Sequence, residues 1–406
     1  MTERHASVAA APGIGRPEFD PHARDFLADP YPFYARLRSA NPAHRSPAGM
    51  WVLSRYADVR DAVRDPRLSS RPSRYSVHAR GNAERFPAAR LARYLLPFLD
   101  APDHTRLRKL VARAISDAQA EDMRGRIASI VERLIAPGLA RGEMDIVREL
   151  AMPLPVEVIA ELLGIPESDR AQLKVWSANF FHIFSPLPPP DVYAALNQAV
   201  VEFSDYLVGL IDQRRRSPGD DAISRLIAAR DNDDRLSEDE LVATCILMFA
   251  NGEESLINLI GNAFHSLLQH PAQMARLRAE PALMRNAVEE LLRFDAPAQI
   301  VGRTALADLE IGGQRIGAGD PVFLLIGSAN RDAAQFADPD RLDLGRNASG
   351  HLGFGGGPHA CIGAGLARIE AQQAIAALLS TTRDIESLLS NPPRHDSAFV
   401  RGLASL

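Results

Sequence analysis

The sequence has only two cysteines and no long apolar run. Cys245 and Cys361 lie far apart in the 406 residues, which excludes a disulfide framework and fits a reducing compartment. No apolar stretch approaches the roughly 18 residues that a membrane-spanning helix needs. Met1 to Gly15 lacks the apolar centre of a signal peptide. We therefore expect a cytoplasmic protein with no membrane partner.

The chain also lacks a Gly/Ser-rich linker, a block of like charges and an internal repeat. We therefore expect a flexible leader over residues 1–20 and one mainly helical domain with small β-sheets over residues 21–406. A hydrophobic content of 46% and a charged content of 24% are typical of a globular protein. A net charge of -5 gives no electrostatic reason to expect nucleic acid as a partner. We expect a monomer.

One cysteine stands in a loop rich in glycine. The loop runs from Phe354 to Gly363 and leads directly into a helix-like run that ends near Leu379. The N-terminus of a helix favours an anion, so we expect it to lower the pKa of the Cys361 thiol and yield a thiolate. The glycines leave room for a wide, flat group to approach the sulfur. A cysteine thiolate as the single protein ligand of a haem iron meets these demands.

Other interpretations of this loop are weaker. A glycine-rich turn around a buried, inert cysteine is the default for a lone Cys. Zinc has too few ligands, since the sequence has His359-x-Cys361 but no C-x-x-C or H-E-x-x-H. A dinucleotide loop fails because Arg368 stands where glycine or alanine is needed. A cysteine nucleophile has only His359 as a nearby base.

A second feature is a long helix with a polar stripe. Ser237 and Glu240 form a capping box, and the helical pattern continues from Glu238 to Gln269, a length of about 48 Å. Its first half is almost entirely apolar, which predicts burial. Polar side chains then recur at offsets of 0, 3, 4 and 7, on one face of the helix: Asn251, Glu254, Ser255 and Asn258. Such a stripe marks either a wet, functional cavity or a polar network that packs one helix on another.

The loop resembles the haem-binding loop of cytochrome P450 enzymes of the soluble bacterial type in Phe354, Gly357, His359, Cys361 and Gly363. The resemblance extends from about Asp29 to the end of the chain. It implies the mainly α, single-domain P450 fold, in which a long central helix crosses the haem. It also implies haem b as cofactor, Cys361 as the iron ligand, and Phe354 and Gly363 at the cofactor.

The resemblance assigns catalytic roles on the long helix, which it implies opens locally to hold dioxygen and a water. Glu254 takes the position of the acid that feeds protons inward, and Ser255 takes that of the alcohol, usually threonine. Asn251 and Gly252 take the positions of an Ala-Gly pair, so that Asn251 replaces a small residue. Serine lacks the methyl that fixes the rotamer, and both departures leave open an outcome other than hydroxylation.

Basic residues are assigned to the haem propionates. His104 and Arg108 lie four apart on one predicted helix, where they project from one face and could bind a carboxylate or form a solvated basic face. By resemblance they hold a propionate, together with Arg303 and His359. The neighbouring Arg106, Lys109 and Arg113 form either a dock for an acidic electron donor or an exposed face.

The resemblance also assigns structural and substrate residues. Glu290 and Arg293, three apart on a helix, are expected to form a buried ion pair with Arg341 as third member. The stretch from Phe180 to Pro190 is expected to form a lid, with Leu68 to Leu96 also over the active site. The predicted substrate pocket consists of Phe249, Ala250, Ala298, Ile300 and Val301.

These assignments imply a monooxygenase that inserts one oxygen atom of O2 into an apolar small molecule by hydroxylation or epoxidation, in natural-product metabolism. No flavin or nicotinamide motif is present, so electrons should come from ferredoxin and ferredoxin reductase. The alternatives are an atypical oxidation on the same scaffold (C–C coupling, desaturation or peroxide-driven chemistry) and a haem-thiolate sensor without turnover. A buried Glu254 argues against the sensor.

Overall fold

The computed structural model describes residues 18–406 except 73–74, 80, 186 and 232–233. Most of the predicted leader, residues 1–17, lies outside the described residues. The predicted boundary at residue 20 is too late, because Phe19 is only 1% exposed and packs edge-on against Phe26 with ring centroids 5.3 Å apart. Phe19 therefore already belongs to a hydrophobic core cluster.

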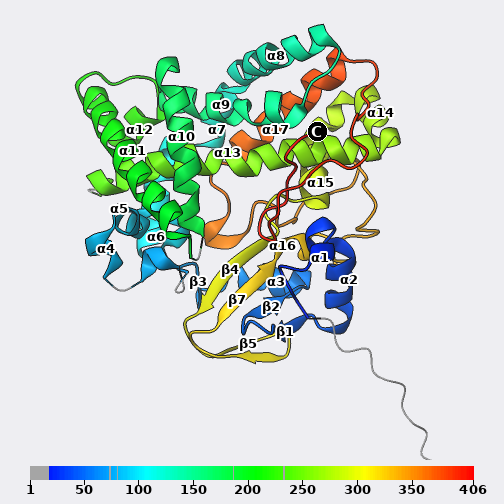
Figure 1. Ribbon diagram of the computed structural model, residues 1–406, viewed down its shortest axis with the longest axis horizontal. Helices are drawn as coiled ribbons and strands as arrows, with labels where there is room; N and C mark the ends of the chain where they lie inside the picture. The colour runs from blue at the N-terminus through cyan, green and yellow to red at the C-terminus, as the bar shows by residue number, and fades with distance from the viewer. Residues whose placement is uncertain (1–17, 73–74, 80, 186, 232–233) are drawn as a thin grey trace, which may run out of the picture.

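The chain is mainly helical, as predicted. The α-helices are α1 (Arg24–Ala28), α2 (Tyr31–Ala40), α3 (Tyr56–Ala62), α4 (Asn82–Arg85), α5 (Pro87–Leu91), α6 (Asp103–Ala114), α7 (Asp117–Asp122), α8 (Arg124–Arg141), α9 (Pro153–Leu163), α10 (Arg170–Phe180), α11 (Pro190–Arg216), α12 (Ala222–Ala228), α13 (Glu238–Gln269), α14 (Pro271–Ala279), α15 (Met284–Phe294), α16 (Ile326–Ala329) and α17 (Ala364–Thr381). Figure 1 shows α13 crossing most of the width of the molecule.

Two small sheets complete the fold. The strands are β1 (Ala43–Arg45), β2 (Trp51–Leu53), β3 (Leu68–Ser69), β4 (Ile300–Ala305), β5 (Leu309–Ile311), β6 (Gln314–Ile316) and β7 (Pro321–Leu325). The larger sheet has the order β1-β2-β7-β4-β3, and the smaller one pairs β5 with β6. Within the larger sheet β2 and β7 are parallel, whereas β4 and β7 are antiparallel. Strands near the N-terminus therefore pair with strands from residues 300–325.

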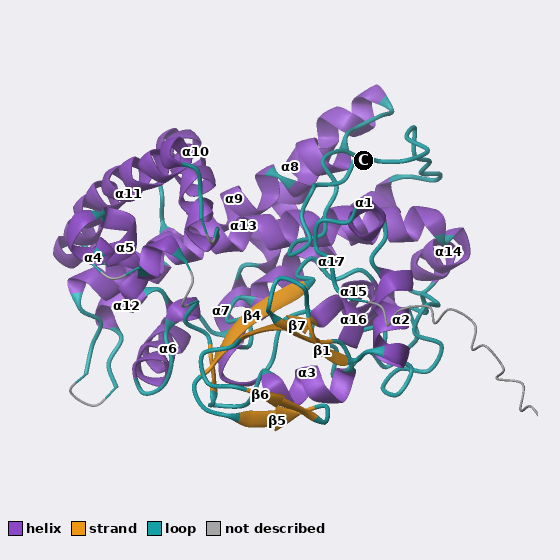
Figure 2. Ribbon diagram, turned by 60° about the horizontal axis from the view of Figure 1, so that its bottom comes forward, coloured by secondary structure: helices purple, strands orange, loops and turns teal. Residues whose placement is uncertain are grey.

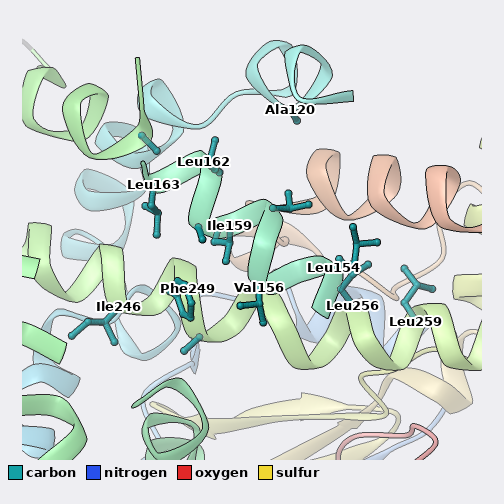
Figure 3. Close-up of a cluster of buried hydrophobic side chains, with 14 of the residues drawn as sticks. Ala120, Leu154, Val156, Ile159, Leu162, Leu163, Ile246, Phe249, Leu256 and Leu259 are labelled. Atoms are coloured by element: carbon teal, nitrogen blue, oxygen red, sulfur yellow. The ribbon is translucent and has the colours of Figure 1, made fainter. Parts of the chain in front are cut away.

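The helices and the larger sheet occupy different parts of the molecule. Figure 2 shows α4, α5, α6, α10, α11 and α12 gathered at one end, away from the strands and α2. The central helix α13 has the predicted bounds, and Ser237 and Glu240 form the predicted capping box. Its apolar first half packs into the main core cluster. Figure 3 shows Ile246 and Phe249 of α13 beside Ile159 and Leu163 of α9.

In the part of the chain that the structure describes, every helix falls short of the length or the apolar character needed to cross a membrane.

Candidate active site

The loop before α17 holds Cys361 through its backbone. The amide of Cys361 donates a hydrogen bond to the carbonyl of Phe354 at 2.9 Å, and Gly355 N–H donates to Leu352 O at 2.8 Å. Gly355 and Gly357 adopt positive φ angles of 70° and 62°. A Cβ on Gly357 would lie 2.8 Å from Val63 O, so the loop can rest on the end of α3 only with glycine there.

The Cys361 thiol is accessible, as a metal ligand must be. The protein around it nevertheless raises the pKa of the thiol by desolvation, while the Gly363 N–H, Arg108 and Arg368 act in the opposite direction. The expectation that the helix N-terminus lowers this pKa is therefore wrong for the protein alone, because desolvation outweighs the helix end and the two arginines.

The predicted propionate residues come together in one cluster, and Arg108 joins this cluster to the residue before the thiol. His104 and Arg108 project from α6, Arg303 from β4 and His359 from the cysteine loop. The rings of His104 and His359 lie 3.9 Å apart between centroids. Arg108 Nη2 donates to Ala360 O at 2.7 Å, next to the thiol. Burial, then the charges of His104, Arg303 and Arg108, lowers the pKa of His359 to about 3, so that its imidazole is neutral at pH 7.

The cluster fits an anionic group. Burial lowers the pKa of Arg303 to about 10, which leaves the guanidinium charged at neutral pH and short of charge compensation. The Nε2 atom of His104 is buried and makes no hydrogen bond in the described structure. Two guanidinium groups and two imidazoles of this kind suit a pair of carboxylates, such as the propionates of haem b.

A salt bridge between Glu289 and Arg368 supports the loop. Arg368 Nε donates to Glu289 Oε1 at 2.5 Å, and its guanidinium lies 4.5 Å from the centre of the Phe354 ring. His351 Nε2 lies 2.9 Å from Glu289 Oε2. Burial raises the pKa of Glu289, but the bonds from His351 and Arg368 outweigh it and bring the pKa to about 2. The ionised carboxylate thus holds Arg368 over the ring of Phe354.

The predicted buried ion pair forms, but with a different third member. Arg293 Nε donates to Glu290 Oε2 at 2.6 Å, and both side chains are 0% exposed. The second arginine on Glu290 is Arg346, at 3.1 Å, not Arg341. Arg341 is 68% exposed and pairs with Asp343. The prediction for Arg341 is wrong because the turn through residues 338–346 directs Arg346 inward.

The polar stripe of α13 is divided between accessible and buried positions. Ser255 and Gly252 are exposed, and Asn251 and Glu254 are half-buried. Burial raises the pKa of Glu254, which favours a protonated carboxyl. The Oδ1 atom of Asn251 is buried without a hydrogen-bond partner in the described structure. The helix continues unbroken through these residues, so the expected local opening is not formed.

The fourth member of the stripe has a packing role. Asn258 is 1% exposed and its amide lies against Gly402, where a Cβ would come within 1.7 Å of Asn258 Oδ1. One turn further on, Asn262 Nδ2 donates to Arg401 O at 2.9 Å. The C-terminal end of the stripe therefore binds the last residues of the chain.

Two of the predicted pocket residues point away from the site. Phe249 is 0% exposed and packs edge-on against Phe203 of α11, with centroids 5.7 Å apart. Ile300 is buried in the core cluster around Phe19. A nearby residue lies on the other face of each element. On α13, Leu247 is half-buried and lies one helical turn before Asn251. On β4, Val301 is half-buried and lies on the strand face that carries Arg303.

The remaining pocket residues differ in accessibility. Ala298 is half-buried, whereas Ala250 is 2% exposed and enclosed in the main core. Leu247 is absent from the predicted pocket, although its offset of four from Asn251 places the two side chains on one face of the helix. Within the predicted lid, the ring of Phe184 in η6 (Phe181–Phe184) lies 5.3 Å from that of Phe98 in η3 (Leu96–Phe98).

The basic face of α6 is largely paired within the chain. Arg106 forms salt bridges with Asp234 and Glu240, and Arg113 pairs with Asp231 at 2.6 Å. These arginines therefore tie α6 to the segment before α13 and to the first turn of α13. Lys109 stays exposed.

An accessible cysteine in a glycine loop, next to a cluster of two guanidinium groups and two imidazoles, is the arrangement expected of a haem-thiolate protein. Comparisons with known proteins agree. Residues 170–384 match the family model described as cytochrome P450. The chain is 41% identical to the cytochrome P450 monooxygenase PikC of Streptomyces venezuelae, over 94% of this chain and 91% of that protein. It is 39% identical to a vitamin D(3) 25-hydroxylase of Pseudonocardia autotrophica, over 97% and 96%.

Solved structures show the same fold. P450BioI, in complex with an acyl carrier protein ligated to hexadec-9Z-enoic acid, superposes with a TM-score of 0.87 at 34% identity, over 94% of this chain and 98% of that one. PksS of the Bacillus subtilis bacillaene polyketide synthase gives 0.86 at 36% identity, over 96% and 98%.

The chain belongs to the cytochrome P450 family and is a monooxygenase that binds haem b.

Proposed function

We propose that the protein hydroxylates or epoxidises an apolar small molecule of natural-product metabolism, with electrons from ferredoxin and ferredoxin reductase. The observation that carries this proposal is the accessible Cys361 thiol beside the basic cluster of His104, Arg108, Arg303 and His359. Relatives named for polyketide biosynthesis support the metabolic setting.

In this proposal Cys361 binds the haem iron and the four basic residues bind the propionates. Haem with a thiolate ligand supplies the activation of O2. Glu254, whose carboxyl is protonated more readily than usual because of burial, donates a proton toward the accessible hydroxyl of Ser255. Ser255 accepts that proton at its Oγ atom as it gives up its own hydroxyl proton toward the reacting centre, so that the hydroxyl stays neutral.

The rest of the site positions an apolar substrate. Leu247 and Val301 present apolar side chains at half-buried positions, and Phe98 and Phe184 add two aromatic rings in contact with each other. The unpaired Asn251 Oδ1 is costly, by about 1–3 kcal/mol, unless a hydrogen bond satisfies it. We assign that bond to a polar group on the substrate, which would orient the molecule and fix the carbon that is oxidised. An atypical oxidation remains the second candidate, since Asn251 and Ser255 depart from the family pattern.

A screen for binding followed by turnover tests the proposal. Apolar compounds that shift the ferric haem from low to high spin should be oxidised when NADPH, ferredoxin and ferredoxin reductase are added, with one oxygen atom of 18O2 in the product. Asn251→Ala should weaken binding of hits that carry a hydrogen-bond donor by about tenfold and leave hits without one unchanged. Spin-shifting compounds that are never oxidised would support a sensor; coupled or desaturated products without 18O would support the atypical oxidation.

A further inference from the structure

A second carboxyl group of α13, Glu253, lies outside the catalytic stripe. It follows Asn251 by two residues, about 200° around the helix, and so points to the opposite side. Its Oε1 atom is buried and has no hydrogen-bond partner in the described structure. Burial raises the pKa of Glu253 to about 8, and Ser177 and Lys174 of α10 offset only part of this. The site therefore keeps a carboxyl group that is largely protonated at neutral pH.

The surroundings of Glu253 offer little to stabilise its charge. Within the described residues, Lys174 is the one charged group that lowers the pKa of Glu253, and Lys174 is exposed at the surface of α10. From α9, the nearest side chain to the neighbouring Gly252 is the apolar Ile159, 4.0 Å from where a Cβ would lie. From α11, Phe203 covers Phe249, one turn before Glu253. Figure 3 shows this apolar contact between α9 and α13.

The helix that Glu253 faces leads directly to the lid. Ser177 is buried on α10, one turn before the end of that helix. The next residues form η6, which belongs to the predicted lid, and Phe184 of η6 contacts Phe98 of η3. A displacement of α10 from α13 would therefore carry the lid with it.

We propose that Glu253 is a protonation-controlled latch between α13 and α10. In its neutral form it lets α10 pack against α13, with Ser177 at hydrogen-bonding reach. In its ionised form it requires water or the Lys174 ammonium group, and it obtains them when α10 moves outward and the lid opens. The proposal concerns only how α10 packs against α13, so it holds whatever the substrate and the redox partner are.

The sign of the pH effect follows from the raised pKa. The folded protein holds the proton more tightly than the unfolded chain, so ionisation costs stability from about pH 4.5 upward, and the cost becomes constant above about pH 8. Glu253→Gln, which cannot ionise, should raise the midpoint of thermal unfolding of the holoprotein. The gain should be about three times larger at pH 8.5 than at pH 5.5.

Hydrogen exchange measured by mass spectrometry tests the movement itself. Relative to Glu253→Gln at the same pH, peptides covering residues 170–184 of the wild type should exchange faster at pH 8.5 by a factor of about three or more, and equally at pH 6. The control is Glu238→Gln, an exposed carboxylate at the start of α13 that pairs with Arg215. It should match the wild type at both pH values.

Ser177→Ala keeps the proposal testable if Glu253→Gln does not fold. Removal of the hydroxyl takes away a group that stabilises the ionised form, so the rise in exchange of residues 170–184 should begin at a higher pH than in the wild type. An exchange ratio that does not change with pH would overturn the latch. So would a pH-dependent gain in stability without any change in α10, because Glu253 would then be a buried acid with no mechanical effect.

Discussion

Arg293→Met is expected to lower the free energy of unfolding by about 3–5 kcal/mol, a large share of the 5–15 kcal/mol typical of a folded protein. The guanidinium of Arg293 is fully buried and donates to both oxygens of Glu290, as well as to Asn330 O at 2.8 Å and Pro339 O at 3.0 Å. Methionine fills much of the volume but leaves the carbonyls of Asn330 and Pro339 without this donor. It also leaves Arg346 as the remaining arginine that pairs with Glu290.

Denaturation by urea measures this loss, and the chain offers two matched controls. Arg346→Met removes the second, 11% exposed partner of Glu290 and should cost about 2–4 kcal/mol. Arg341→Met breaks only an exposed pair with Asp343 and should cost less than about 1 kcal/mol. Equal losses for Arg341 and Arg346 would contradict the structure of the turn between residues 338 and 346.

Glu254→Gln should slow product formation by about 10²–10⁴-fold, the usual contribution of a positioned proton donor. The amide has nearly the same shape but no acidic proton. NADPH oxidation should continue and produce hydrogen peroxide in place of product. Measuring product, NADPH and peroxide in the same reaction separates the loss of proton delivery from a loss of folding or of electron transfer.

The pH profile gives an independent check on Glu254. Burial raises the pKa of this carboxyl, so the fraction that carries a proton falls as the pH rises through that raised value. Product formation by the wild type should fall over the same range, and Glu254→Asp should keep such a fall because it keeps the acid. Unchanged, fully coupled turnover by Glu254→Gln would remove Glu254 from the proton route.

The sequence determined those parts of the structure that depend on local chemistry. The bounds of α13 were predictable because the capping box at Ser237 and the Pro271 that follows are local signals. The convergence of His104, Arg303 and His359 was predictable only from the resemblance, since they come from three separate elements. From periodicity alone, each of the three would be predicted to be a solvated basic residue.

The wrong predictions concern the direction in which a side chain points. Phe249 and Leu247 are both apolar residues of the same helix, and only the packing of Phe203 shows which of them turns away from the site. Arg341 and Arg346 lie five residues apart in an irregular segment, where no repeat fixes which side chain turns inward. Glu253 lies outside the polar stripe, so helical periodicity gives it no role, although a second acid in a buried helix is itself costly.

The optical spectrum of the reduced, carbon-monoxide-bound protein tests the central claim most directly. Thiolate coordination through Cys361 should give the red-shifted Soret band, and Cys361→Ser should lose that band while the protein stays folded. A purified protein without porphyrin, or a spectrum typical of an imidazole ligand and unaffected by Cys361→Ser, would contradict the account.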